Sequence, residues 1–418
     1  MPNLPPELSP EKRMSHLDEL FRTLDPERLG AGYAAARRAQ DVEESIRQVA
    51  RHFRSRPRRL PDDDPGFLCY DADRAERAVR GEVEVVNIPW KFPDGRIDFL
   101  FDPTAIHGPV NHEWVWQLNR HGYWGDMARA FAAGGDGRYA RQFNIQLRDW
   151  IARTDCPADW NAPGSAWRTI ETGLRLMGAW PVAFEFFRCS PFFTDENLCL
   201  MLASMHRQAV HLASHPTSGN WLLMEMNGLY TFATLFPEFR TAAGFRELSA
   251  RTLSGALRGQ LLPDGMHDEL SPDYHSVVFR CGCAMYRLAG LYHQAGELPP
   301  DSIMRVHNDT LKKPSELGVP LPPQVEQAIM KALAVKAEDR FSTMEAFIEG
   351  ITGKTPASFH HRTMAVPSGQ TAAGSDGKPG LWTRFRRSHI GVQITALVLC
   401  DLLTQRFGTD YLAKGAGL

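Results

Sequence analysis

Apolar side chains recur with helical spacing over most of residues 112–295. In the segment NLCLMLASMHRQAVHLASH they recur at intervals of three and four, which places them on one buried face: Leu198, Met201, Met205, Ala209 and Leu212. Comparable runs cover Gly125–Ile151, Trp167–Phe187, Leu223–Phe236 and Ala242–Leu261. A series of antiparallel helix pairs is the economical architecture, either a bundle or an α/α toroid.

The segments before this region follow other patterns. Residues 1–64 alternate charged and apolar positions in helical fashion, as in SHLDELFRTL, and predict an N-terminal helical arm. Residues 66–110 show short alternation and a Pro-Asp-Gly turn, which is typical of a few irregular strands. The predicted fold class is therefore all-α dominated, with a small irregular β segment ahead of the main helical region.

The pattern changes again after residue 313. Residues 313–353 predict two helices, the first with Val325, Ile329 and Leu333 on one face, and the second opening with the capping box Ser342–Glu345. Residues 354–380 are rich in Gly, Ser and Pro and predict a disordered linker, because such a stretch buries too little apolar surface to order itself. Residues 381–418 predict one apolar helix and a tail.

Composition narrows the class of protein. With 43% hydrophobic residues and a formal charge of −2, the chain is predicted to be globular, and it offers no general case for nucleic acid as a partner. The Arg-rich stretch Arg51–Arg59 is interpreted as a solvated basic helix and linker. The seven cysteines lack metal-type spacing, so we expect reduced, mostly buried thiols and no cofactor or metal.

No targeting or membrane segment is visible in the sequence. The N-terminus has no apolar signal-peptide core, which predicts a cytoplasmic location. The longest apolar run, Ile390–Cys400, is shorter than the roughly 20 residues that a membrane span requires, so no membrane partner is expected.

Candidate chemistry gathers in the segment LLPDGMHDELSPDYHSVVFRCG. Ser271 followed by Pro272 predicts a helix start, which puts Tyr274 and His275 in the first turn. The positive end of the helix dipole favours a phenolate there, as an acid–base site requires. The alternative interpretation is that both are surface residues beside a charged loop.

Four segments in order resemble the helical domain of heparinase II/III-type polysaccharide lyases, over about residues 65–300: Trp116–Ile151, Trp167–Leu176, His215–Phe239 and Leu262–His275. The resemblance implies an incomplete α/α toroid with a long groove. It also implies cleavage of a heparan-, heparin- or alginate-like anionic polysaccharide by β-elimination beside a uronic acid. Family members usually work in the periplasm or outside the cell.

The resemblance implies roles for particular residues. Asn220 matches the asparagine that binds the uronic-acid carboxylate, a role that suits an amide because it donates hydrogen bonds without titrating. Tyr274 matches the catalytic tyrosine, serving as acid and candidate base, with His275 or His121 as the other candidate proton acceptors. Asn227 and Glu225 are expected to be internal polar ties, with Glu225 pairing to an arginine.

Further residues match the wall of the groove in relatives: Asn119, Arg120, His121 and Trp124. An arginine there pairs with sugar carboxylates or sulfates, and an aromatic ring stacks on a sugar face. Arg175 is either another ligand or the i,i+4 partner of Glu171.

The sequence also departs from the family. Relatives continue into a β-sandwich that supplies a further histidine, and no such strand pattern follows residue 300, which predicts impaired catalysis. Instead, Pro314–Phe347 resembles the last two helices of bacterial serine/threonine protein kinases, including Arg340, although the kinase catalytic motifs are missing. The open alternatives are a lyase, a catalytically inactive toroid that binds anionic glycans, and a helical interaction module; the sequence does not indicate an oligomeric state.

Overall fold

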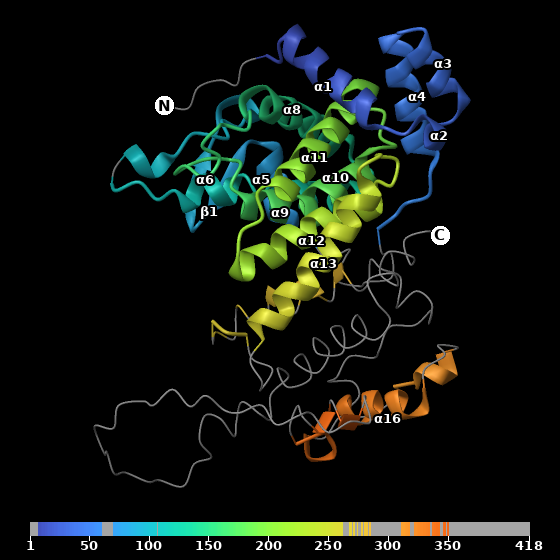
Figure 1. Cartoon of the computed structure of the whole chain (residues 1–418). Coiled ribbons are helices and arrows are strands. Elements are labelled where there is room, and N and C mark those ends of the chain that lie inside the picture. Colours follow the sequence, from blue (N-terminus) through green and yellow to red (C-terminus); the bar gives the residue numbers. More distant parts are fainter. Residues whose placement is uncertain are drawn as a thin grey trace. The chain divides into compact units, whose positions relative to one another are not determined.

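The computed structural model describes residues 7–60, 70–106 and 108–261 and, beyond them, 267–269, 271, 274, 277–278, 280–282, 284–285, 311–317, 322–334, 337–342, 346–347 and 349–350. The chain divides into two compact units, Met1–Leu253 and Ser254–Leu418. Within the described ranges it is mostly helical, with one two-stranded sheet (Figure 1). The all-α dominated fold class is thereby confirmed. The division between the units lies inside residues 65–300, and the predicted domain boundaries stay a prediction.

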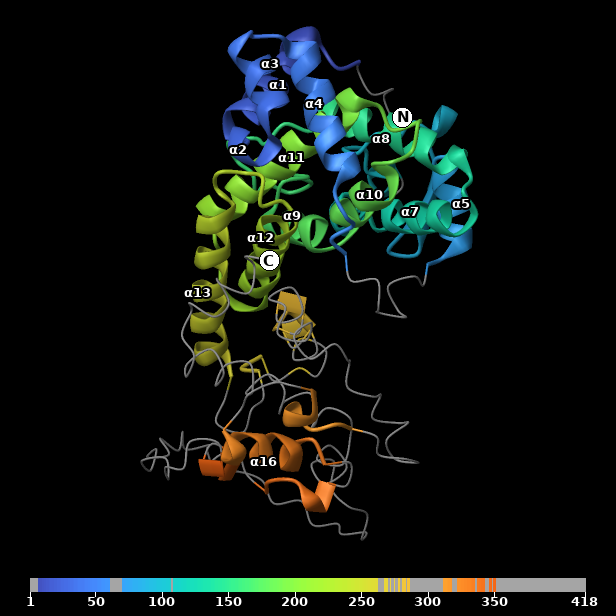
Figure 2. The same ribbon diagram turned by 90° about the vertical axis from the view of Figure 1, so that its right-hand side faces the viewer.

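The first unit opens with four helices: α1 Pro10–Thr23, α2 Pro26–Leu29, α3 Ala31–Arg38 and α4 Val42–Ser55. Ser9, Asp25 and Asp41 cap three of them by accepting a backbone amide of the first turn, which sets where each helix begins. Both α1 and α4 pack against α11, Asp195–Ser214. Figure 2 shows these helices, in blue, together at one end of the unit.

The irregular β segment is smaller than predicted. It holds helix α5, Ala72–Val79, and one antiparallel hairpin of β1, Glu82–Val85, and β2, Ile88–Lys91. Val86 and Asn87 form the two-residue turn with φ of 48° and 61°, the left-handed conformation that such tight hairpins require. The Pro-Asp-Gly stretch is not the hairpin turn, because Pro93–Gly95 forms a short 3₁₀ helix, η2, and Pro103–Ile106 forms another, η3.

The main helical region follows in the predicted order: α6 Glu113–Leu118, α7 Gly122–Gly134, α8 Gly137–Arg153, α9 Thr169–Met177, α10 Ala179–Phe187, α11, α12 Gly219–Leu235 and α13 Ala242–Gln260. Two predicted runs are each split by a glycine. Gly135 ends α7 with φ of 70°, and Asp136 then caps α8. Gly178 separates α9 from α10, whose first turn accommodates Pro181.

In the second unit, the described residues from 311 onward form η4 Pro314–Leu317, α16 Pro323–Ala332 and η5 Ala337–Asp339. The apolar face predicted for the first of these helices is present, because Val325, Ala328, Ile329 and Ala332 pack with Phe347. Glu345 of the predicted capping box and residues 354–418 lie outside the described residues.

Helices α9 and α12 make the most extensive contact between helices in the first unit. Gly173 faces Gly228, and a Cβ atom at Gly173 would lie 2.9 Å from the Cα atom of Glu225 and from the carbonyl oxygen of Met224. A Cβ atom at Gly228 would lie 2.5 Å from the carbonyl oxygen of Gly173. The two backbones therefore touch directly, and only glycine fits at both positions.

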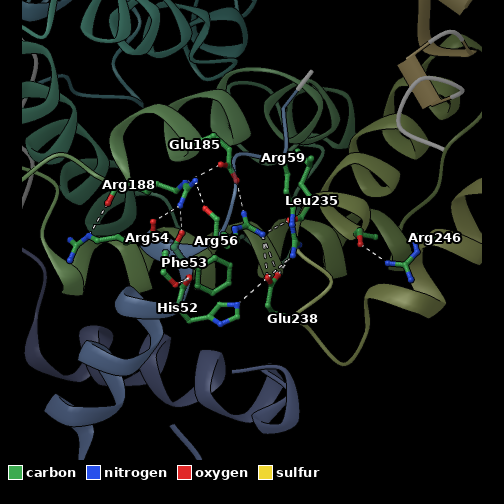
Figure 3. Close-up of polar contacts among 12 residues, drawn as sticks. His52, Phe53, Arg54, Arg56, Arg59, Glu185, Arg188, Leu235, Glu238 and Arg246 are labelled. Carbon is green, nitrogen blue, oxygen red and sulfur yellow. Dashed lines mark hydrogen bonds and ion pairs between the residues drawn. The ribbon is translucent and has the colours of Figure 1, made fainter. Parts of the chain in front are cut away.

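A buried ion cluster joins the N-terminal helices to this region (Figure 3). The guanidinium of Arg56, just after α4, donates to the Glu185 carboxylate at 2.5 Å and to the carbonyl of Leu235 at 2.7 Å. Its Nη1 atom also lies 3.3 Å from the carboxylate of Glu238, which His52 contacts at 3.2 Å. Burial alone would raise the pKa of Glu238, but the His52 hydrogen bond and the nearby arginines lower it below its ordinary value.

The glycine contact predicts the effect of a methyl group. We expect Gly173→Ala to lower the free energy of unfolding by about 1–3 kcal/mol or more, because two packed backbones must separate. Gly244→Ala is the matched control, since a Cβ atom there meets nothing within 4 Å, and it should raise stability by up to about 1 kcal/mol. Urea denaturation of both variants tests this, and equal midpoints would refute the contact.

The lowered pKa of Glu238 predicts a pH dependence. A carboxylate whose pKa is lower in the folded state stabilises the fold at pH values above its ordinary pKa of 4.5. This contribution is lost as the pH falls through the pKa of the folded state. Glu238→Gln should cost about 3–5 kcal/mol at neutral pH, because it leaves buried Arg56 partly uncompensated. In denaturation series between neutral and acidic pH, the difference in unfolding free energy between Glu238→Gln and the wild type should shrink once the pH falls below the ordinary pKa of 4.5. A difference independent of pH would contradict the assignment.

Candidate functional site

Asn220 lies in the first turn of α12, as predicted from the turn-forming residues before it. Ser218 is the N-cap residue and Gly219 has a φ of 61°. The Asn220 residue is buried, with 8% of its surface exposed. Its place at the start of the helix puts a neutral amide donor beside Trp221.

The carboxylate of Glu225 fixes the loop before Asn220. It is buried and accepts hydrogen bonds from the backbone amide of Thr217 at 3.0 Å and from the Thr217 hydroxyl at 2.7 Å. The predicted internal tie is present, but these hydrogen bonds come from a threonine where an arginine was expected. Asn227, two residues further along, is also buried, and its side-chain carbonyl oxygen accepts a hydrogen bond from the Thr231 hydroxyl at 3.2 Å.

A second buried carboxylate, Glu171 at the start of α9, holds two arginines. Arg168 donates to its two oxygens at 2.7 and 2.8 Å in a bidentate pair, and Arg120 donates to it at 3.0 Å. Glu171 is fully buried, whereas the Arg120 side chain is 32% exposed. Glu171 therefore pairs with Arg168 and Arg120, while the predicted pairing with Arg175 is wrong.

Two tryptophans flank Arg168. Its guanidinium carbon lies 3.4 Å from the ring centroid of Trp116 and 5.0 Å from that of Trp221, the residue that follows Asn220. Both rings are partly exposed. Two donors here, the Nε atom of Arg120 and the Nε1 atom of Trp116, are buried with no hydrogen-bond partner among the described residues. The cluster therefore combines partly exposed aromatic side chains with a buried carboxylate and the arginines that it holds.

This cluster contains three residues that sequence reasoning missed: Trp116, Arg168 and Trp221. The signal that could have found Arg168 is its spacing of three from Glu171 in the motif WRTIE, which suits an ion pair on one helix turn. The contact of Arg168 with Trp116 joins positions 52 residues apart, and no local pattern reveals it.

The structure corrects four predicted substrate ligands: Asn119, His121, Trp124 and Arg175 are all fully buried. Asn119 donates to the carbonyl of Phe99 at 2.8 Å and accepts from Trp150 at 3.0 Å. Trp124 donates to Gln146 at 2.9 Å. Side chains without exposed surface cannot contact a polymer, and their polar atoms mostly bond within the core, although the Nε2 atom of His121 is buried with no hydrogen-bond partner among the described residues.

His121 and Arg175 also form their hydrogen bonds within the core. His121 accepts a hydrogen bond from Trp180 at 2.9 Å and stacks on Trp124 with ring centroids 3.9 Å apart. Burial and the charge of Arg175 hold the pKa of His121 well below its ordinary value, so it is a neutral core residue and not an accessible proton acceptor. Burial lowers the pKa of Arg175 to about 9, and its guanidinium donates to Gln208 and to the carbonyls of Asn119 and Ala166.

Tyr274 belongs to the second unit, whereas Asn220 belongs to the first. Tyr274 has helical backbone, as predicted, and its residue is 47% exposed. His275 lies outside the described residues. The predicted pairing of Asn220 with Tyr274 across a groove therefore stays a prediction.

The four described cysteines are free thiols; Cys199 and Cys281 are buried as expected, but Cys156 and Cys189 are exposed. Within the described part of the chain, no group of three or more His, Cys, Asp or Glu side chains could hold a metal ion. None of the described helices is long and apolar enough to cross a membrane.

Comparison with known proteins shows one consistent similarity. Residues 21–315 match the family described as heparinase II/III N-terminus. A heparin-sulfate lyase of Bacteroides stercoris is 30% identical over 234 residues, which are 52% of this chain and 34% of that protein. A heparin-sulfate lyase of Pedobacter heparinus is 27% identical over 277 residues, 65% of this chain and 42% of that protein.

A solved structure, the crystal structure of heparinase III, has the same fold over 66% of this chain and 43% of its own, with a TM-score of 0.57 and 22% identity. The chain thus spans between 34% and 43% of the length of these proteins.

The Glu171 cluster predicts a large stability effect. We expect Glu171→Gln to lower the free energy of unfolding by about 3–5 kcal/mol, because it leaves the buried guanidinium of Arg168 without its counter-charge. Glu113→Gln is the matched control: Glu113 also approaches Arg120, but at 3.8 Å and with a side chain that is 42% exposed, so we expect a change within about 0.5 kcal/mol. Urea denaturation compares the two, and similar losses would show that Glu171 is not the central charge.

Proposed function

Because the chain belongs to the family defined by the heparinase II/III N-terminus, we propose that it is a polysaccharide lyase, a carbon–oxygen lyase that cleaves an anionic, uronic-acid-containing polymer by β-elimination. The curated relatives carry the name heparin-sulfate lyase, which makes heparan- or heparin-like chains the first candidates and alginate-like chains the second. The observation that carries the proposal is the placement of Asn220 at the start of α12. It directly precedes Trp221, one of the two tryptophans that flank Arg168 in the Glu171 cluster.

The reaction explains why an amide is needed. A base removes the proton at C5 of the uronic acid, a double bond forms between C4 and C5, the C4–oxygen bond breaks, and an acid protonates the leaving oxygen. The C5 proton is weakly acidic until the adjacent carboxylate is neutralised or hydrogen-bonded. Asn220 supplies that donor, and the Glu225–Thr217 hydrogen bonds hold the preceding loop in place.

Tyr274 is proposed as the proton carrier, which protonates the leaving oxygen and is also the candidate base for the C5 proton; His275 is the alternative acceptor of that proton. The exposure of Tyr274 supports this role, since a phenol that exchanges protons with a polymer must be reachable. His121 is not proposed again, because it is buried in the tryptophan-rich core.

Arg120 and Trp116 are proposed to contact neighbouring sugar units. Arg120 is partly exposed and is held by Glu171, so its guanidinium is oriented before a ligand arrives. Trp116 is partly exposed, and its ring is the proposed stacking surface for a sugar.

A toroid that binds anionic glycans without cleaving them is the second candidate. It is favoured by one observation: the partly exposed guanidinium of Arg120 is held by the buried Glu171, and binding an anionic glycan requires such an oriented cation but no proton carrier. The kinase-like character of residues 314–347 and a helical docking role for the cluster of α16 and Phe347 remain proposals without further support. The cytoplasmic location also stays a prediction.

Purified full-length chain should produce an unsaturated sugar that absorbs ultraviolet light when it is mixed with heparan sulfate, heparin or alginate. Asn220→Ala should lower kcat by about 10²–10³-fold, as expected for loss of a donor to developing charge. Tyr274→Phe should lower it by about 10²–10⁴-fold, as for loss of an acid–base group.

Tyr70→Phe is the matched control, because Tyr70 is also exposed but has no proposed role; its rate should equal that of the wild type. Retained glycan binding without product from any polymer would favour the inactive toroid. A measurable lyase activity that survives both substitutions would show that the site is elsewhere.

A further inference from the structure

A pocket of about 390 Å³ lies in the first unit, and Asn220, Arg120 and Trp116 of the proposed lyase site are not among the residues that line it. It is formed by His16 of α1, the end of α8 with the loop after it, Trp167 and α11. Its volume lies within the range of about 300–1,000 Å³ that is typical of small-ligand sites. The pocket is therefore large enough to hold a small organic ligand.

The pocket has a buried floor and an exposed mouth. Trp150, Trp167 and Ser204 form the floor and are at most 4% exposed, whereas Cys156 and His215 lie at the mouth and are exposed. Two tryptophan rings give the floor an apolar surface of the kind on which sugar rings pack. A site of this form covers most of a small ligand and still lets it enter from solvent.

The hydroxyl of Ser204 is a polar group on the floor that the protein itself does not use. Ser204 is 2% exposed, and it makes no hydrogen bond to another of the described residues. Buried hydroxyls in proteins nearly always have a hydrogen-bond partner, because leaving one unpaired costs free energy. A ligand hydroxyl that reaches the floor supplies such a partner.

The hydrogen bonds of His211 make one of its ring nitrogens an acceptor. Its Nε2 atom lies 2.8 Å from the carbonyl oxygen of Trp167, and a carbonyl only accepts, so Nε2 carries the hydrogen and Nδ1 keeps a lone pair. The thiol of Cys156 lies 3.8 Å from Nδ1 and is a weak donor, which a hydroxyl can replace. Burial lowers the pKa of His211 to about 4, so the ring stays a neutral acceptor at pH 7.

His215 adds a second acceptor at the mouth. Its Nδ1 atom lies 3.0 Å from the carbonyl oxygen of His211, so by the same argument its Nε2 atom keeps a lone pair. The two imidazole rings are 4.7 Å apart. Adjacent acceptors of this kind suit a ligand that carries several hydroxyl donors.

The charged side chains that line the pocket are neutralised within the protein. Arg207 donates to the Glu19 carboxylate at 2.6 Å and to the Nε2 atom of His16 at 3.0 Å. The carboxylate of Asp155 pairs with Lys12 at 2.8 Å. The lining therefore offers a hydroxyl and two neutral acceptors but no uncompensated charge, which favours a neutral ligand over an anionic one.

We propose that this pocket binds a neutral disaccharide unit, whose rings pack on Trp150 and Trp167 and whose hydroxyls bond to Ser204, to His211 Nδ1 and to His215 Nε2. Ser204 and His211 are seven residues apart on α11, which is about 10 Å along a helix, a span that a single sugar ring does not bridge. The pocket is a second carbohydrate site, and its occupation does not require the lyase reaction.

Alkylation of the full-length chain by iodoacetamide in the presence of cellobiose tests the proposal, with peptide mass spectrometry as the readout. At a cellobiose concentration about ten times Kd, the alkylation rate of Cys156 should fall about 10-fold, because a bound sugar covers the mouth. Cys189 is the internal control, since it is also an exposed free thiol but does not line the pocket; its rate should not change.

Three outcomes of this assay would overturn the proposal. Cys156 could react equally fast with and without cellobiose, or both cysteines could be slowed equally, which would be an effect of the medium. Glucose could also protect Cys156 as well as cellobiose does at the same molar concentration, which would contradict the span of two rings. The assay involves no turnover, so its result is independent of lyase activity.

A variant of the floor provides the second measurement. Ser204→Ala should weaken cellobiose binding by about 2–10-fold, the usual effect of one hydrogen bond. Ser249→Ala is the matched control, because Ser249 is a buried helical serine whose hydroxyl donates to the carbonyl of Phe245 and does not line the pocket. Equal affinities of the two variants, both shown to be folded by circular dichroism, would refute the role of the floor. If Ser204→Ala does not fold, the alkylation of the wild type decides.

Discussion

The contact between Gly173 and Gly228 is the constraint on which the candidate site depends. It brings the backbones of α9 and α12 into direct contact, and it thereby sets the distance between the side chains at the starts of these two helices. Arg168 and Glu171 lie at the start of α9, and Asn220 and Trp221 at the start of α12. A wider helix pair would separate Arg168 from the Trp221 ring, which lies 5.0 Å from its guanidinium. The glycine contact therefore sets both the packing of α9 against α12 and the geometry of the candidate site.

Local signals predicted much of this arrangement. The positions of the main helices follow from spacing, and the start of α12 follows from Ser218 and Gly219. Glycine also ended helices inside two predicted runs, at Gly135 and Gly178, where an apolar pattern continues through the break. The hairpin turn at Val86 and Asn87 was missed because valine rarely adopts a positive φ, while Pro-Asp-Gly is the stronger turn signal.

The site itself was only partly predictable, for a physical reason. The segment from Asn119 to Trp124 combines polar and aromatic residues, which in a sequence indicates either a binding wall or a satisfied polar core. Burial decides between them, and burial depends on partners far away: Asn119 meets Trp150, and His121 meets Trp180. Arg120, between them, alone keeps 32% of its side chain exposed. Neighbouring residues in one short turn thus differ in the burial of their side chains, and no local sequence pattern predicts this difference.

The proposed function requires two properties of one site. Recognition of an anionic polymer needs oriented donors and aromatic faces, which the proposal assigns to Arg120, Trp116 and Asn220. Elimination also needs a proton carrier at the same sugar, which the proposal assigns to Tyr274. Under this proposal Tyr274→Phe lowers kcat and leaves glycan affinity intact, whereas a substitution of Glu171 lowers both together, because Glu171 holds the guanidinium of Arg120.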